Sequence, residues 1–445
     1  MRQKEFPRRS EKGQVLIIVM LMMIGLLGFT ALAVDGGMIY VERRGAQTAA
    51  DAGALAGGWK IAESLDTASP RVTYDNWSCS LSQVDFARSE GVDNAILQAG
   101  NNNYTIDDDI TDNHGVATEC YEEDLGTYMD RYVDLTTQVT SEVSTAFAHF
   151  VFGDNLVQTV TARVRVRPQT PLAFGYAVVA LNDNGCNGNQ NGAIFRGSAD
   201  VDLDGGGVYS AGCLRGNGSN FTLDVLNGGI TYVGGFSGNS SNMHPTPSNE
   251  DEVIPPSALS VPQPDCSSLP SQGQYNNGGG TLQPGVYTRI RITNGIHTME
   301  PGLYCVTNSN SSFLVTGGEL TGIGVTIYVA NTGGRVRITG NADVVFEAPA
   351  NSYYTPAIQG VLIYAESVSG ESSDNYFQGN NSTSFLGLIY VPNGEIDITG
   401  SNSTSPTFNT QFVGYNVEMY GNATVDINFN GPQNYQRPAS LNLQE

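Results

Sequence analysis

The sequence predicts an N-terminal transmembrane helix, then a small α+β region close to the membrane, then a mainly β region built like a right-handed parallel β-helix solenoid. Three observations predict this order: an uncharged apolar run over 15–34, strand-like alternation between 132 and 166, and short strand motifs with Gly- and Asn-rich turns from about 171 onward. We therefore divide the chain into a cytoplasmic tip, transmembrane anchor and small-residue helix (1–60), a membrane-proximal region (61–168) and a Gly/Asn-rich β-helix-like domain (169–445).

The apolar run from Val15 to Val34 is long enough to cross a bilayer, because a helix of about 20 residues spans about 30 Å. A cleavable signal peptide usually has a shorter apolar core and a small-residue cleavage pattern, so we favour a retained anchor. Prepilin-type cleavage between Gly13 and Gln14 is another alternative, but Ile18 stands where type IV prepilins typically carry glutamate. The positive-inside tendency places the tip in the cytoplasm, because it is basic at Arg2, Lys4, Arg8, Arg9 and Lys12.

A second helical stretch, 45–58, is rich in alanine and glycine. Residues four apart lie along one row of a helix surface, and small residues in such a row allow another helix to approach closely. The sequence contains two such rows, so we expect a helix–helix contact here rather than a plain helix leaving the membrane. The rows are Ala46, Ala50 and Ala54, and Ala49, Gly53 and Gly57.

The membrane-proximal region ends in a strand–helix–strand pattern. Residues 132–143 and 157–166 alternate as strands do, and Ser144 to Phe152 is apolar enough for a short helix. Pro168 and Pro171 then end the pattern. This predicts a small α+β unit.

The C-terminal region carries two repeated strand motifs. Imperfect repeats of about 20–30 residues with short strands and Gly/Asn turns are typical of a solenoid. A β-sandwich or jelly roll, which also consists of short strands and turns, is the alternative. A stretch from Ser237 to Gly280 interrupts the repeats and reads as a long loop. The first motif occurs at 207–209, 229–232, 285–287, 302–304, 324–328, 360–364 and 387–390, and the second at 338–342, 398–402 and 419–423.

The charge distribution excludes one class of partner. The chain has a net charge of −23, and no lysine follows Lys60. A protein surface with this excess of negative charge repels nucleic acid and anionic membranes, so we expect no nucleic-acid function.

The six cysteines lie too far apart for a metal knuckle, and none forms a C-x-x-C pair. An even number of cysteines in an exported segment indicates disulfides. We expect sequential pairing, because each bond then closes a loop within one region; six separate thiols are the alternative. The expected pairs are Cys79–Cys120, Cys186–Cys213 and Cys266–Cys305.

Candidate chemistry is sparse. Asp200, Asp202 and Asp204 precede Gly205 as in a calcium loop, but Ala211 occupies the position where an EF-hand has glutamate. The alternative is a strand whose aspartates face outward. Apart from calcium at these aspartates, no cofactor is expected. No catalytic constellation is visible, and we expect no enzyme.

The N-terminal features occur in a characteristic order: 11–14 (EKGQ), the apolar helix, 33–37 (AVDGG), Tyr40, Arg43, Arg44, Gln47 and 49–57 (AADAGALAG). This order resembles the TadE/TadG-like Flp (tight adherence) pilus-assembly family. The segment from 132 to 167 is also similar to the membrane-proximal part of that family. One departure is Gly53, which replaces an alanine of the Ala-rich run.

The resemblance implies an accessory component of Flp/Tad pilus assembly. It implies a single-pass protein of a bacterial cell membrane with a cytoplasmic N-terminus and an extracytoplasmic bulk, whose partners are pilus-assembly proteins. Two alternatives stay open. The chain could be a membrane-tethered adhesin whose β-helix binds carbohydrate or another surface, or a polysaccharide lyase or hydrolase.

Overall fold

The computed structural model describes residues 14–147, 156–186, 192–309, 312–340, 342–368, 375–378, 380, 382–399, 407–422 and 424–444. The basic tip before Gln14 lies outside these residues. The chain forms two compact units. We name them the anchor unit (Met1–Glu122, Arg131–Pro168 and Ala439–Glu445) and the parallel-sheet unit (Glu123–Asp130 and Gln169–Pro438).

The anchor unit begins with one long helix, α1 (Gln14–Thr67), which contains both helical stretches that the sequence predicts. A second helix, α2 (Ser82–Asn101), buries Val84, Ala87, Gly91, Ala95 and Ala99 at spacings of three and four residues. That spacing is the period of one helix face, and this face packs on α1.

A four-stranded sheet completes the anchor unit, in the order β1 (Gly115–Asp124), β2 (Met129–Val143), β3 (Leu156–Arg167) and β31 (Ser440–Gln444). The strands predicted at 132–143 and 157–166 are confirmed as β2 and β3, which pair antiparallel. The predicted helix over Ser144–Phe152 does not occur at Ser144–Phe147, and the rest of it lies outside the described residues. The backbone N–H groups of Ala146 and Phe147 bind the carboxylate of Asp35 instead of forming a helical turn.

The parallel-sheet unit contains a 25-stranded sheet whose described strand pairs are all parallel. The pairings form three ladders, in which a strand usually pairs with the strand three further along the chain. Ladder A consists of β15 (Ser271–Asn276), β17 (Gly285–Ile292), β19 (Gly302–Val306), β22 (Val325–Val329), β25 (Val361–Ala365), β27 (Ser384–Thr399), β28 (Thr407–Gly421), β5 (Val178–Ala180), β8 (Val208–Ser210), β11 (Ile230–Tyr232) and β14 (Ser248–Asn249).

Some strands belong to more than one ladder: β15 and β17 contribute to ladders A and C, and the long strands β27 and β28 contribute to all three. Ladder B consists of β16 (Gly280–Leu282), β18 (Ile296–Met299), β21 (Glu319–Ile323), β24 (Asp343–Glu347), β27, β28, β29 (Thr424–Asn428), β7 (Asp200–Asp204), β10 (Thr222–Leu226) and β13 (Met243–His244). Ladder C consists of β15, β17, β20 (Phe313–Val315), β23 (Val336–Ile338), β26 (Asn375–Gln378), β27, β28, β6 (Ala193–Gly197), β9 (Cys213–Asn217) and β12 (Gly235–Gly238).

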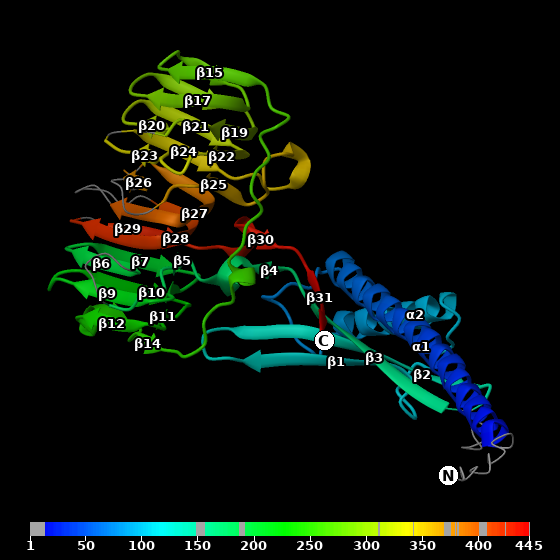
Figure 1. Cartoon of the computed structure of the whole chain (residues 1–445). Coiled ribbons are helices and arrows are strands. Elements are labelled where there is room, and N and C mark those ends of the chain that lie inside the picture. Colours follow the sequence, from blue (N-terminus) through cyan, green and yellow to red (C-terminus); the bar gives the residue numbers. More distant parts are fainter. Residues whose placement is uncertain are drawn as a thin grey trace, which may run out of the picture. The chain divides into compact units, whose positions relative to one another are not determined.

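The chain does not pass through these ladders in sequence order. Strands β5 to β14 come first and end at one extreme of the unit, and β15 then begins at the opposite extreme (Figure 1). The following strands lead back until β28 and β29 pair with β5, β6 and β7. The chain enters and leaves through adjacent short strands, β4 (Thr170–Pro171) and β30 (Gln436–Arg437), which pair antiparallel.

The core of the parallel-sheet unit consists of inward side chains stacked in register. On ladder B, Phe346, Phe385 and Phe408 are register partners on successive strands, with ring centroids 6.0 Å and 5.4 Å apart. Offset aromatic stacks add stabilisation to the burial of their area. Stacking of like residues therefore fixes the register of neighbouring strands.

Both repeated motifs correspond to single ladders. Each copy of the first motif supplies a strand of ladder A, from β8 to β27, and the second motif supplies the C-terminal parts of β23, β27 and β28 in ladder C. The repeats therefore mark equivalent positions in a parallel sheet. Short 3-10 helices join some strands: η1 (Leu172–Gly175), η2 (Ser240–Asn242), η3 (Pro256–Ala258), η4 (Ser352–Tyr354) and η5 (Gly431–Gln433).

Candidate functional site

The first half of α1 is exposed and apolar. Phe29 and Leu32 are 75% and 71% exposed, and α1 is long and apolar enough to cross a membrane. Val15 and Val34, the predicted ends of the span, are both exposed. Because a soluble helix buries such side chains, this pattern is consistent with a membrane anchor.

Asp35, directly after this run, is 5% exposed. Its Oδ1 accepts the backbone N–H of Ala146 at 2.7 Å, and both of its oxygens accept the N–H of Phe147 at 3.1 Å. Hydrogen bonds from N–H groups to a carboxylate are charge-assisted, so they compensate for the burial of this charge. Asp35 therefore fixes the segment after β2 to the helix.

The small-residue rows of α1 face the interior of the anchor unit. Four of the predicted packing residues are completely buried alanines, and the two glycines are also buried. They contact α2 and the sheet of the same chain, so these rows already have partners. The residues are Ala46, Ala49, Ala50, Gly53, Ala54 and Gly57.

The two helices approach most closely where glycines face each other. A Cβ on Gly57 would lie 2.7 Å from the backbone oxygen of Gly91 and 2.7 Å from Cδ1 of Leu135. A Cβ on Gly91 would lie 2.5 Å from Cγ1 of Ile61. No side chain fits at these distances, so the crossing of α1 and α2 requires glycine on both helices.

Tyr104, after α2, provides a polar contact to α1. Its hydroxyl donates to Oε1 of Glu42 at 2.8 Å. Burial and the hydrogen bond to the Glu42 carboxylate raise the pKa of Tyr104 to about 12. The hydroxyl therefore stays a donor across physiological pH.

All six cysteines form disulfides. The bonds are Cys79–Cys120, Cys186–Cys213 and Cys266–Cys305, so the predicted pairing is confirmed. Disulfides persist in oxidising compartments, and these three are consistent with export of both units.

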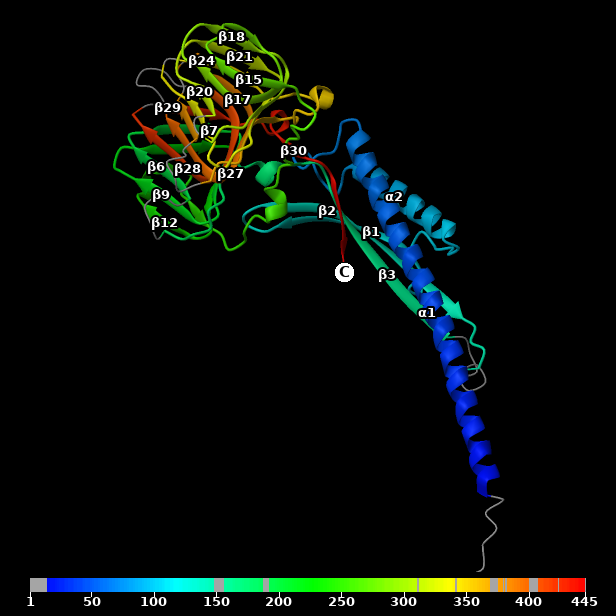
Figure 2. The same ribbon diagram turned by 45° about the horizontal axis from the view of Figure 1, so that its top comes forward.

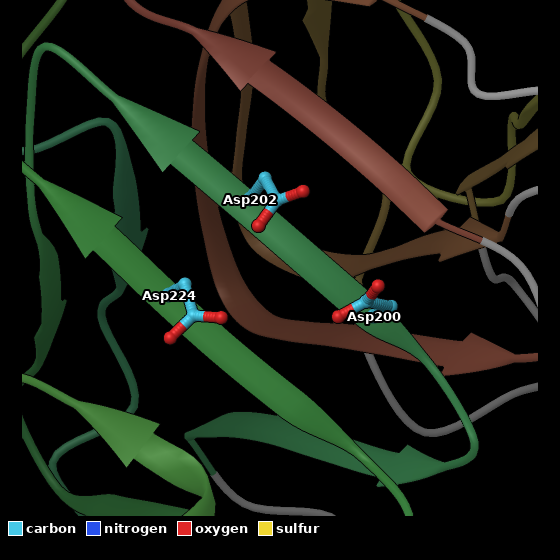
Figure 3. Close-up of side chains that lie close together, drawn as sticks. All are labelled: Asp200, Asp202 and Asp224. Atoms are coloured by element: carbon cyan, nitrogen blue, oxygen red, sulfur yellow. The ribbon is translucent and has the colours of Figure 1, made fainter.

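The aspartates of the predicted calcium site lie on β7. Figure 3 shows Asp200 and Asp202 on this strand and Asp224 on its neighbour β10. Oxygens of these three carboxylates lie within 4.8 Å of one another, whereas Asp204 is outside this group and accepts from Nδ2 of Asn227 at 2.8 Å. The cluster forms because Asp202 and Asp224 occupy the same register position on neighbouring strands, and not from the alternation of aspartates along β7 alone.

Asp202 has the most strongly negative surroundings of this group. Register places Asp224 on one side of it and Asp426, from β29, on the other. Burial, followed by the charges of Asp200, Asp426 and Asp224, raises the pKa of Asp202 above its ordinary value. Like charges directly opposite each other destabilise a sheet, so a divalent cation would relieve this row.

A second acidic group, on the outer face of ladder C, was not apparent in the sequence. Carboxylate oxygens of Glu395, Asp397 and Glu418 lie within 4.8 Å of one another, and Asp397 and Glu418 are register partners. Both of these acids are buried, and Glu418 forms an ion pair with Arg196. The alignment of EIDITG (395–400) with NVEMYG (416–421) is the sequence signal that places the two acids side by side.

A row of outward tyrosines runs along ladder A at Tyr328, Tyr364 and Tyr390. The segment 250–270 covers this row: Nε2 of Gln263 donates to the Tyr328 hydroxyl at 2.5 Å, and the Tyr390 hydroxyl donates to the backbone oxygen of Leu259 at 2.9 Å. Burial raises the pKa of Tyr390 to about 12. These aromatic faces are therefore not available to a carbohydrate.

Comparison with known families identifies the anchor region. Residues 13–60 match the Tad family, described as Flp pilus-assembly TadE/G-like, so the predicted resemblance is confirmed for this segment. No curated protein and no solved structure matches the chain. The matched segment contains the apolar run, Asp35 and the small-residue rows. Together with the apolar helix, it supports a Flp/Tad pilus-assembly membrane protein.

Proposed function

We propose that the protein is a membrane-anchored, exported accessory component of Flp/Tad pilus assembly that acts in surface attachment through structure and interaction rather than catalysis. The observation that carries this proposal is the coincidence of the Tad-family match, 13–60, with a helix that is exposed and apolar up to Val34 and packs into a folded unit from Ala46 onward. In this proposal residues 1–60 anchor the chain, 61–168 form the membrane-proximal region together with β31, and the parallel-sheet unit is the displayed part.

The topology of the proposal is single-pass, with a cytoplasmic N-terminus and an extracytoplasmic bulk. Three disulfides support an oxidising location for the folded units. Protease treatment of spheroplasts tests the orientation. Digestion of the folded units from outside would agree with it, and their protection would contradict it.

We infer that the displayed region is a right-handed parallel β-helix. Three parallel ladders with a recurring three-strand step support this architecture, because each turn of such a solenoid contributes one strand to each face. The role of such a scaffold is the display of extended side surfaces to a partner.

Deletion of the gene, followed by a count of Flp pili on the cells, tests the proposed function. We expect fewer pili or weaker surface attachment, restored by the full chain. A matched control replaces residues 14–60 by an unrelated anchor followed by a helix that keeps the buried alanines and glycines. Normal piliation of the deletion strain would contradict the proposal.

The adhesin is the alternative function, favoured by the polar outer face of ladder B, where Thr298 and Thr321 lie in register with each other. The covered tyrosine row removes the aromatic platform that a carbohydrate would use. Binding of the full chain to a glycan array would favour the adhesin. If the protein were a polysaccharide lyase or hydrolase, it would show an enzymatic activity that depends on the acidic group Glu395, Asp397 and Glu418.

Calcium is the cofactor that we retain as a proposal, at Asp200, Asp202 and Asp224. The pKa of Asp202, raised by burial and by its acidic neighbours, supports a cation at this place. A calcium-dependent rise in Tm that Asp202→Asn abolishes would agree with it, and an equal rise in both proteins would not.

A further inference from the structure

The end of the anchor-unit sheet at which β2 finishes and β3 begins is held at a definite position along α1. Ala146 and Phe147, which follow β2, donate their backbone N–H groups to Asp35, the residue directly after the apolar run. In Figure 2 the ends of β2 and β3 lie beside the middle of α1, and the helix continues past them to its N-terminus. The hydrogen bonds therefore place this end of the sheet where the helix would leave the hydrocarbon core.

Large apolar side chains are exposed at this same height. Phe147 is 48% exposed, and Val157, at the adjoining end of β3, is 63% exposed. On α1, Met38, Tyr40 and Val41 are 41%, 67% and 70% exposed. Burial of Phe and Val side chains is favourable, so the exposure of these side chains to water at one end of a folded unit indicates a missing apolar partner.

An open groove joins these side chains. It has a volume of about 640 Å³ and lies between α1 and the end of β2, where Val34, Gly37, Met38 and Val41 face Val143. Its lining is apolar close to the end of the span, and becomes acidic at Glu42 and Glu142 on its margin. An acyl chain or the glycerol region of a lipid matches this change in polarity.

The distances agree with the dimensions of a bilayer. A helix rises about 1.5 Å per residue, so Met38 to Tyr40 lie about 6–9 Å beyond Val34. The headgroup layer on each side of a hydrocarbon core is about 5–8 Å thick. Tyrosine is enriched in that layer, and Arg43 and Arg44 follow about 14–15 Å beyond Val34, on the aqueous side of it.

We infer that this end of the anchor unit lies in the headgroup layer of the bilayer that α1 spans, with Phe147 in contact with lipid and Asp35 as the positioning residue. The partner is the phospholipid surface on the side of the folded units. The inference rests on the anchor of the proposed function. It assigns the buried aspartate a specific role, which is to hold the β2–β3 end of the sheet at the boundary of the membrane.

Site-directed fluorescence on the full chain in phosphatidylethanolamine/phosphatidylglycerol vesicles tests this inference. Because every native cysteine is disulfide-bonded, a single introduced thiol can be labelled with the environment-sensitive probe NBD without removing the others. The test position is Phe147→Cys, and Leu26→Cys within the apolar run reports insertion of the anchor. The control is Phe86→Cys, a 60% exposed residue of α2 that lies beside Lys60 and Thr67.

Phe86 resembles Phe147 in exposure but lies far from the proposed membrane boundary, because the Lys60 end of α1 is about 40 Å along the helix from Asp35. We expect blue-shifted emission and strong quenching by doxyl-labelled lipid at 26 and 147, and neither effect at 86. Quenching at 26 without quenching at 147 would overturn the inference and leave the anchor intact. Absence of quenching at 26 would overturn both.

Asp35→Ala distinguishes positioning from general stability. It removes the acceptor of the Ala146 and Phe147 N–H groups, so the probe at 147 should lose its blue shift while the probe at 26 keeps it. Trp77, which is buried in the anchor unit, reports whether the fold persists. An unchanged probe at 147 would contradict the role of Asp35.

Discussion

Replacing Gly57 by alanine tests the packing of α1 against α2 in the anchor unit. A Cβ at this position meets the backbone oxygen of Gly91 and Cδ1 of Leu135, both at 2.7 Å. The backbone oxygen cannot rotate away, so α2 must shift. Overpacking of this kind costs about 1–3 kcal/mol, against a gain of up to about 1 kcal/mol for alanine in a helix interior.

Gly100→Ala on α2 is the matched control, because nothing lies within 4 Å of the added Cβ. It receives the helix-propensity gain without the clash, so Gly57→Ala should be less stable than Gly100→Ala by about 1–3 kcal/mol. At about 2–4 °C per kcal/mol, the difference in Tm is measurable.

The assay is tryptophan fluorescence during thermal or urea unfolding of the full chain in detergent. The chain has two tryptophans, Trp59 and Trp77, and both lie in the anchor unit, so their signal reports this unit selectively. Equal stability of Gly57→Ala and Gly100→Ala would refute the close approach of α1 and α2.

Three further changes probe other parts of the account. Cys266→Ser combined with Cys305→Ser opens a disulfide with a sequence separation of 39. This double change should lower the stability of the parallel-sheet unit by about 2–4 kcal/mol and accelerate proteolysis within 250–270. An unchanged cleavage rate would show that the disulfide does not secure this segment. Because the folded-state pKa of Asp202 is raised from 3.8, the stability of the protein falls as pH rises through the raised value. Asp202→Asn should therefore raise Tm at neutral pH and leave it unchanged below about pH 3. An equal gain in Tm at both pH values would contradict the repulsion between the aspartates. Truncation before Ala439 removes β31 and should lower the stability of the anchor unit by about 1–3 kcal/mol. Leu443→Ala, at a half-exposed position of the same strand, should change that stability little. Equal effects of the two changes on stability would show that β31 is not part of the sheet.

Sequence periodicity predicted the elements whose pattern is local. The apolar run, the strands β2 and β3 and the copies of the first motif in ladder A all have regular spacing, and each one corresponds to an observed element. The helix α2 was missed, although Val84, Ala87, Gly91, Ala95 and Ala99 are spaced as one helix face. Its contact surface consists of small residues, and these give a weaker apolar signal than leucine or isoleucine.

The remaining differences come from contacts between residues that are distant in the sequence. Ser144–Phe147 was apolar enough for a helix, but Asp35, more than a hundred residues earlier, binds its backbone N–H groups. Asp397 and Glu418 were dispersed in the sequence and became neighbours only through the register of β27 and β28. The small-residue rows pack against α2, which belongs to the same chain.

Photocrosslinking from the exposed face of the anchor tests the central claim most directly. Phe29, 75% exposed in the apolar run, would be replaced by benzoylphenylalanine in cells that assemble Flp pili, and the adducts identified by mass spectrometry. The account predicts adducts with membrane proteins of the pilus-assembly machinery. Adducts with lipid alone, in cells whose pilus machinery is present and active, would contradict it.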